Sequence, residues 1–258
     1  MFFHFQILLY SLVFYFFLQF VTGDFVSDWL LSIVDGWSWS MAFFLSFSFF
    51  GFFQIAKNVS RKLWMTPIPV LLTISTTGLL YFVQSIKQQQ LLILLAGIAY
   101  YFLHIALYRL RTCETDKTAR GIISAGSVST IFLFYAMSYG IYLNFAIPLW
   151  ILMGMLMIVT VLVSLQYLWL INNDSKIVLN YSLVLGFVMA EIIWILNFWP
   201  FGYLTTGVIS LIFYYVFWDL VQRHFLSELS KRRVVANVII FGLLTALVLS
   251  STRWLPVV

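Results

Sequence analysis

The acidic residue Glu191 is the clearest candidate for chemistry in this sequence. It lies in the stretch "MAEIIWILNFWPFGY", residues 189–203, where most of its neighbours are apolar. A carboxyl group in such surroundings can be protonated and act as a structural hydrogen-bonding tie. Alternatively, it can titrate in a wet cavity and carry a proton or a cationic substrate. The sequence leaves both alternatives open.

Four polar residues are predicted to share a site with Glu191. Asn180 stands eleven residues earlier, about 20° away around an α-helix, so both side chains point in nearly the same direction. After the short "NFWPFGY" connection, the returning segment brings Thr206 and Ser210 to about the same depth. Tyr214 continues that stripe at a spacing of four residues. These hydroxyl groups are the predicted hydrogen-bond partners of the carboxyl group.

Signatures of other chemistry are sparse. The sequence contains no glycine–serine elbow, paired-histidine zinc motif, phosphate loop or paired aspartates spaced for magnesium. The histidines at 4, 104 and 224 have no spacing that predicts a metal or haem site. We therefore predict no catalytic residue, metal or cofactor. The single cysteine, Cys113, excludes an intrachain disulfide and is predicted to be a free thiol, with palmitoylation as the alternative.

Composition indicates which elements must position these residues. The chain has 258 residues, of which 63% are apolar and only 9% are charged, against about 25% charged in soluble proteins. A soluble fold of this size cannot hide so much apolar surface. The sequence therefore predicts an integral membrane protein, with residues 1–258 forming a single membrane domain.

Long apolar runs predict an all-α, polytopic transmembrane helical bundle. A helix needs about 20 residues to cross the hydrocarbon layer, and lipid leaves irregular backbone without hydrogen-bond partners. About nine spans are predicted, or eight if the first does not cross. They cover residues 2–22, 38–56, 64–84, 91–110, 120–143, 147–171, 177–198, 203–222 and 234–252.

The basic residues predict the orientation of these spans. Positively charged loops are retained on the cytoplasmic side. With the N-terminus in the cytoplasm and the C-terminus outside, twelve of the fourteen lysines and arginines fall on the cytoplasmic side. Only Lys87 and Arg253 do not. This placement accounts for the net charge of +5 without nucleic acid as a partner.

A segment between the first two spans, residues 24–36, is predicted to be an amphipathic helix in the outer interface. Asp24, Asp28 and Asp35 fall within about 40° of one another on a helix, while Trp29 and other apolar residues cover much of the remainder. An anchored loop is the favoured interpretation. A lid over an outward cavity or a cation-attracting patch is the alternative.

Two features inside the spans bear on helix packing. Pro67 is predicted to begin the third span, and the polar run from Thr73 to Gly78 either breaks that helix around an ion or bonds back to its own backbone. The second interpretation is favoured. Small residues at a spacing of four predict packing seams, which comprise Gly121, Ala125 and Ser129, and also Gly242, Ala246 and Ser250.

The carboxyl third carries a resemblance to known sequences. The stretch from "EIIWILNFWPFGYLTTG" to "SKRRVVANVIIFGLL" resembles uncharacterised, multi-pass bacterial membrane proteins of unknown function. Its specific part is the acid followed by "FWPFGY" and the helix after it. The resemblance implies a compact helical bundle in the bacterial cytoplasmic membrane. It brings no catalytic residue.

Three functions follow as hypotheses, with transport favoured and an enzyme disfavoured. The first is transport of a small molecule or ion by means of Glu191. The second is a non-enzymatic membrane scaffold or assembly partner, whose basic loop docks a cytoplasmic protein or anionic lipids at the cytoplasmic face. That loop carries Arg223, Lys231, Arg232 and Arg233. The third is a lipid-modifying enzyme at the outer interface, using the aspartates of residues 24–36.

Overall fold

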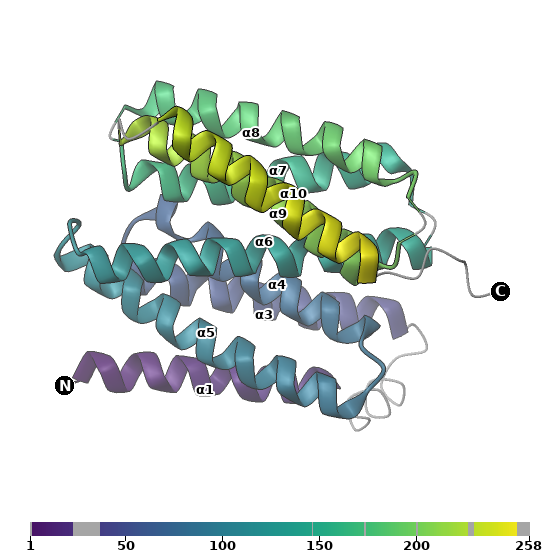
Figure 1. Cartoon of the computed structure of the whole chain (residues 1–258). Helices are drawn as coiled ribbons and strands as arrows, with labels where there is room; N and C mark the ends of the chain where they lie inside the picture. The colour runs from purple at the N-terminus through teal and green to yellow at the C-terminus, as the bar shows by residue number, and fades with distance from the viewer. Residues whose placement is uncertain are drawn as a thin grey trace. The chain divides into compact units, whose positions relative to one another are not determined.

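The fold consists of α-helices. A computed structural model describes residues 2–22, 37–145, 147–172, 174–199, 201–226 and 230–251. Within these ranges the chain forms nine α-helices and one short 3-10 helix, with no strand (Figure 1). Each of the nine predicted spans overlaps one of the α-helices. The predicted all-α class is therefore confirmed.

Two compact units divide the chain. Unit 1 is Met1–Gly126 and unit 2 is Ser127–Val258. The boundary falls inside a continuous helix, α6 (Lys117–Phe145), which belongs partly to each unit. The predicted single membrane domain stays a prediction.

Unit 1 is built around the contact between its first helix and a later one. Helices α1 (Phe2–Thr22) and α5 (Ile86–Thr112) run antiparallel along each other (Figure 1). At one end the rings of Phe3 and Tyr108 stack with centroids 4.6 Å apart. At the other end the amide of Gln19 donates to the side chain of Gln90 at 2.6 Å. Unit 1 also contains α3 (Trp37–Ser60), a 3-10 turn (Leu63–Met65) and α4 (Pro67–Phe82).

Aromatic rings form the centre of unit 1. The Phe14 ring of α1 stacks on Tyr100 of α5 with centroids 4.4 Å apart. Phe52 of α3 meets Phe14 edge-on at 5.5 Å. Offset and edge-on ring pairs of this kind add to the free energy gained by burying apolar area. They fix three helices around one core.

In helix α4, the polar run from Thr73 to Gly78 does not break the helix. The helix begins at Pro67, whose missing amide hydrogen has no helical partner in the first turn. The buried hydroxyls of Thr73, Thr76 and Thr77 donate to carbonyl groups three or four residues earlier. The helix continues unbroken to Phe82. The favoured prediction, in which hydroxyls bond back to the helix backbone, is confirmed.

Unit 2 stacks four further helices in chain order. Helix α7 packs on α8, α8 on α9, and α9 on α10. Their connections are short, so neighbouring helices run antiparallel (Figure 1). Their bounds are Leu149–Trp169 for α7, Ser175–Leu196 for α8, Tyr203–Phe225 for α9 and Lys231–Ser251 for α10.

Close helix approach occurs at glycines other than the predicted ones. A Cβ atom on Gly207 would lie 3.1–3.2 Å from backbone and Cβ atoms of Ala136, where α9 meets α6. A Cβ on Gly186 would lie 3.2 Å from the carbonyl oxygen of Met157 on α7. In contrast, the predicted seams through Gly121 and Gly242 are exposed. That prediction is wrong, because spacing alone does not say which face of a helix meets a neighbour.

Seven helical segments are long and apolar enough to cross a membrane. The predicted second and ninth spans, which correspond to α3 and α10, are not among them in the described residues. In α3, "WSWSMAFFLSFSFFGFFQIAKNVS", the side chains of residues 37–45 lie outside the described part of the chain, so the second span stays a prediction. In α10 the stretch with described side chains, Val234–Ser250, is apolar but shorter than the seven segments, so the ninth span also stays a prediction. By length and composition, the chain is a membrane protein with several spans.

Candidate functional site

Helix α8 carries the candidate residues Glu191 and Asn180. Its start is fixed by Asp174, whose side chain accepts hydrogen bonds from the amides of Lys176 at 3.0 Å and Ile177 at 3.4 Å. Its buried stripe recurs at helical spacing and faces neighbouring helices. The stripe comprises Val178, Ser182, Leu185, Gly186, Met189, Ala190, Ile193 and Leu196.

Glu191 points away from this buried stripe. Met189 and Ile193 are buried, and a residue two positions away from each lies about 200° around the helix. Both Glu191 and Asn180 are exposed, which agrees with their predicted common direction. Large apolar side chains share that face, among them Phe187 and Trp194. The exposed face of α8 is therefore apolar with one acid and one amide in it.

The predicted hydroxyl partners lie elsewhere. Thr206, Ser210 and Tyr214 form a buried stripe on α9, as their spacing predicts. The Thr206 hydroxyl donates to the Gly202 carbonyl at 3.1 Å, and the Tyr214 hydroxyl lies 3.2 Å from that of Ser164 on α7. Within the described residues, no hydrogen bond joins Glu191 to this stripe. The structure brings the hydroxyls together and leaves the acid outside.

A buried hydroxyl core in unit 2 was not predicted as a whole. The Tyr135 hydroxyl of α6 lies 2.6 Å from that of Thr160, which itself donates to the Leu156 carbonyl at 2.6 Å. Tyr139 of α6 lies against Ser210 of α9 without reaching hydrogen-bond geometry. Tyr135 thus contacts α7, and Tyr139 lies beside the α9 stripe. Their signal in the sequence is weak, because tyrosines also occur at membrane surfaces.

Asp219 of α9 links the two helices that flank the basic loop of unit 2. Asp219 is buried and accepts hydrogen bonds from Arg223 Nε at 2.6 Å and from Asn237 Nδ2 of α10 at 2.5 Å. Asp219 and Arg223 also form an ion pair. Lys231 and Arg232 are exposed at the start of α10. The side chain of Arg233 and residues 227–229 lie outside the described part of the chain.

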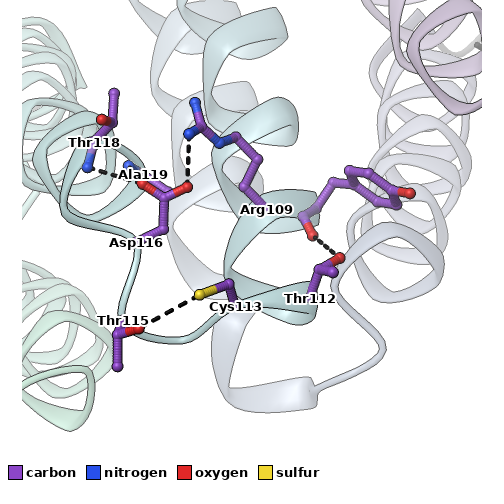
Figure 2. A network of polar contacts seen from close by, with 8 residues as sticks. Arg109, Thr112, Cys113, Thr115, Asp116, Thr118 and Ala119 are labelled. Carbon is purple, nitrogen blue, oxygen red and sulfur yellow. Dashed lines mark hydrogen bonds and ion pairs between the residues drawn. The ribbon is translucent and has the colours of Figure 1, made fainter.

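Figure 2 shows a second charged cluster, in unit 1, where α5 ends and α6 begins. Asp116 accepts hydrogen bonds from the amides of Thr118 at 3.0 Å and Ala119 at 3.2 Å, so it caps α6. Its other carboxylate oxygen pairs with Arg109 at 2.7 Å. The Ala119 amide first, and then the Arg109 charge, hold the pKa of Asp116 below its usual value.

The loop before α4 joins the same cluster. Lys62 forms an ion pair and hydrogen bond with Glu114, and this contact lowers the pKa of the Glu114 carboxyl group. Arg120 Nε donates to the Glu114 carbonyl at 3.0 Å. Cys113 is exposed, and its sulfur lies 3.4 Å from the Thr115 hydroxyl (Figure 2). The predicted free thiol stays a prediction. Two loops that are distant in sequence therefore meet at one end of unit 1.

Neither the histidines nor the acids form a metal site in the described ranges. His104 is fully buried, and its Nδ1 lies 2.8 Å from the Tyr100 carbonyl, while His4 and His224 are exposed. The interfacial helix predicted for residues 24–36, with Asp24, Asp28 and Asp35, lies outside the described residues.

Sequence comparison shows the family. No curated protein and no solved structure matches the chain. A family of proteins of unknown function matches residues 21–254, well beyond the carboxyl third that carried the resemblance. The predicted kinship with uncharacterised proteins is therefore confirmed, whereas their bacterial origin stays a prediction. The chain belongs to the DUF5656 family of proteins of unknown function.

Proposed function

We propose that this protein is a non-enzymatic membrane assembly protein that pairs with a second copy of itself through the exposed face of α8. One observation carries the proposal. Glu191 and Asn180 are both exposed on the same face of a helix that has the length and composition of a membrane span. A polar side chain in a span usually faces protein or water, so we expect another protein surface to pack against this face of α8.

Because Glu191 lies inside the span, contact with another protein group would lower the free energy of its carboxyl group. Glu191 lies five residues before the end of α8 at Leu196, which places it about 7 Å inside the helix end. A carboxyl group in hydrocarbon costs up to a few kcal/mol, and hydrogen bonding to another protein group offsets part of that cost.

The chemistry of the two polar groups favours a second copy as the occupant. A protonated carboxyl group and a carboxamide each carry both a donor and an acceptor, so each is complementary to itself. A two-fold axis along the membrane normal brings every residue against its own copy at the same depth. Glu191 would meet Glu191 and Asn180 would meet Asn180, with each contact worth about 0.6–2 kcal/mol. Phe187 and Val184 would pack between them.

The other two hypotheses find less support. A transporter needs a hydrated path to Glu191, and a pocket of about 340 Å³ among the described residues of α1 and α5 is mostly apolar and does not include Glu191. The enzyme hypothesis depends on aspartates that lie outside the described residues. For docking of a further partner or anionic lipid at the basic loop, Lys231 and Arg232 are the exposed residues.

The proposal also covers the membrane in which the protein lies and its orientation there. We infer a bacterial cytoplasmic membrane, with the N-terminus in the cytoplasm and the C-terminus outside. The support is the distribution of lysines and arginines, which gather at the ends of α3, α5 and α9 and at the starts of α6 and α10.

Single-cysteine cross-linking in membranes tests the pairing. Cys113 is first replaced by serine, which leaves a chain without cysteine. Phe187→Cys on α8 is then compared with Ile158→Cys on α7, because the two side chains are 58% and 60% exposed. After oxidation we expect a covalent dimer at position 187 and far less at position 158. Equal cross-linking at both positions, or none at 187, would contradict the pairing.

Two substitutions of Glu191 separate assembly from transport. Glu191→Gln keeps a self-complementary neutral group and is expected to preserve the cross-link at position 187. Glu191→Leu removes both donor and acceptor and is expected to weaken it. A titrating transport residue would instead lose its activity in the glutamine variant, whatever the state of association.

A further inference from the structure

We propose that one end of unit 1 binds the phosphate group of an anionic membrane lipid, with Arg111 as its central contact. This basic end is where α3 and α5 finish and α4 and α6 begin. Two ion pairs hold it together: Lys62 with Glu114 joins two loops, and Arg109 with Asp116 joins the end of α5 to the loop that follows it. Its basic residues are Lys57, Arg61, Lys62, Arg109, Arg111, Lys117 and Arg120.

The charge balance of the basic end is strongly positive. Seven basic residues stand beside two acidic ones, so five positive charges are in excess. Both carboxylates are already paired with a basic side chain. At the opposite end of unit 1, where α5 begins, Lys87 is the one charged residue in the described part. An anion would therefore be attracted to the basic end specifically.

Arg111 has an unfilled donor at this end. Its guanidinium carbon lies 5.8 Å from the centre of the Phe3 ring, and Phe3 in turn stacks on Tyr108. Its Nη1 atom is buried and has no hydrogen-bond partner among the described residues. A buried donor without a partner costs free energy, and a bound acceptor would remove that cost. The guanidinium group is planar and binds phosphate oxygens in pairs.

The position of Arg111 selects lipid as the source of the phosphate. Helix α5 has 27 residues, which makes it about 40 Å long and longer than the roughly 30 Å hydrocarbon layer. Arg111 lies in the last turn of this helix, so it falls at the depth of the headgroups. Basic residues at that depth on the cytoplasmic side attract anionic lipids.

Lipid retention by the purified full-length chain tests this site. The protein is reconstituted with equal amounts of phosphatidylglycerol and phosphatidylcholine, and the lipids that remain bound are identified by native mass spectrometry. Arg111→Gln is compared with Lys87→Gln, which removes one positive charge from the same helix at its other end. We expect Arg111→Gln to reduce the preference for phosphatidylglycerol about tenfold, as for the loss of one charged hydrogen-bonding group.

The controls make each outcome decisive. Retained preference in Lys87→Gln and partial retention in Arg111→Lys support the site, because lysine keeps the charge without the planar group. An equal loss in the two glutamine variants, or no preference in the wild type, overturns it. If Arg111→Gln does not fold, the wild type is measured at rising salt. A phosphatidylglycerol preference that does not fall with salt overturns the proposal as well.

Discussion

At the scale of single residues, the polar side chains of the helices fall into two groups. Hydroxyl groups such as those of Thr73 and Thr160 point inward and bond to a backbone carbonyl of their own helix. Asp219 also points inward and is bonded by Arg223 and Asn237. Glu191 differs, because it is exposed on a face that is otherwise apolar. Its placement, rather than its residue type, makes it the candidate for association.

The carboxyl group of Asp116 is expected to make the start of α6 sensitive to acid. Its pKa is lowered in the fold, first by the Ala119 amide and then by Arg109. A carboxyl group whose pKa is lowered by folding stabilises the folded state at pH values above its ordinary pKa. This stabilisation is lost as the pH falls through the lowered pKa of the folded state. We expect protection of the Thr118 and Ala119 amides against hydrogen exchange to be steady from about pH 7 to pH 5 and to fall below about pH 4.

A matched variant isolates the titration of Asp116. Asparagine caps helices about as well as aspartate but does not titrate. Protection of the same two amides in Asp116→Asn should therefore change much less between neutral and acidic pH. Equal acid sensitivity in the two proteins would show that another group controls this helix start.

At the scale of helices, packing depends on a few close approaches. Gly207 of α9 faces backbone atoms of Ala136 on α6, and backbone cannot rotate away as a side chain can. Gly154 of α7, in contrast, has open space where a Cβ would lie. The two glycines are alike in sequence context, since both stand inside apolar helices.

The two glycines predict opposite effects on stability. Gly207→Leu should lower the free energy of unfolding by about 1–3 kcal/mol, because the added side chain overpacks the contact between α6 and α9. Gly154→Leu should leave stability unchanged or raise it by up to about 1 kcal/mol, since leucine favours the helix more than glycine does. Unfolding in detergent, followed by circular dichroism, measures both. Similar losses in the two variants would contradict the close approach at Gly207.

At the scale of the whole molecule, the proposed orientation assigns each loop to one side of the membrane. The basic end of unit 1 carries the exposed thiol of Cys113, and the proposed orientation puts this end in the cytoplasm. Lys87, at the start of α5, would then face outside. These two positions lie at opposite ends of one helix, so their sides must differ if α5 spans the membrane.

Thiol labelling of intact cells tests the proposed orientation. A maleimide that crosses membranes should label Cys113, and a charged maleimide that does not cross should leave it unlabelled. In the Cys113→Ser background, Lys87→Cys should react with the charged reagent from outside. The reverse pattern would invert the orientation, and labelling of both positions from outside would show that α5 does not cross.

Much of the secondary structure could be predicted from sequence for a simple reason. In lipid, a backbone amide must find its partner within its own helix, so a long apolar run has one available structure. This holds for α4, where Pro67 begins the helix and the buried hydroxyls bond back to it. It holds for α3 as well, whose serines and tryptophans do not interrupt the helix.

The sequence alone therefore determined the helical class, the positions of the helices and the common direction of Glu191 and Asn180, because each depends on local hydrogen bonding and helical periodicity. Only the tertiary structure decided which face of each helix is covered. It placed Gly207 rather than Gly121 at a close approach, buried the α9 hydroxyls and left Glu191 exposed. It also brought Lys62 to Glu114 across two loops. These outcomes depend on contacts between segments far apart in the chain, which periodicity within one helix does not specify.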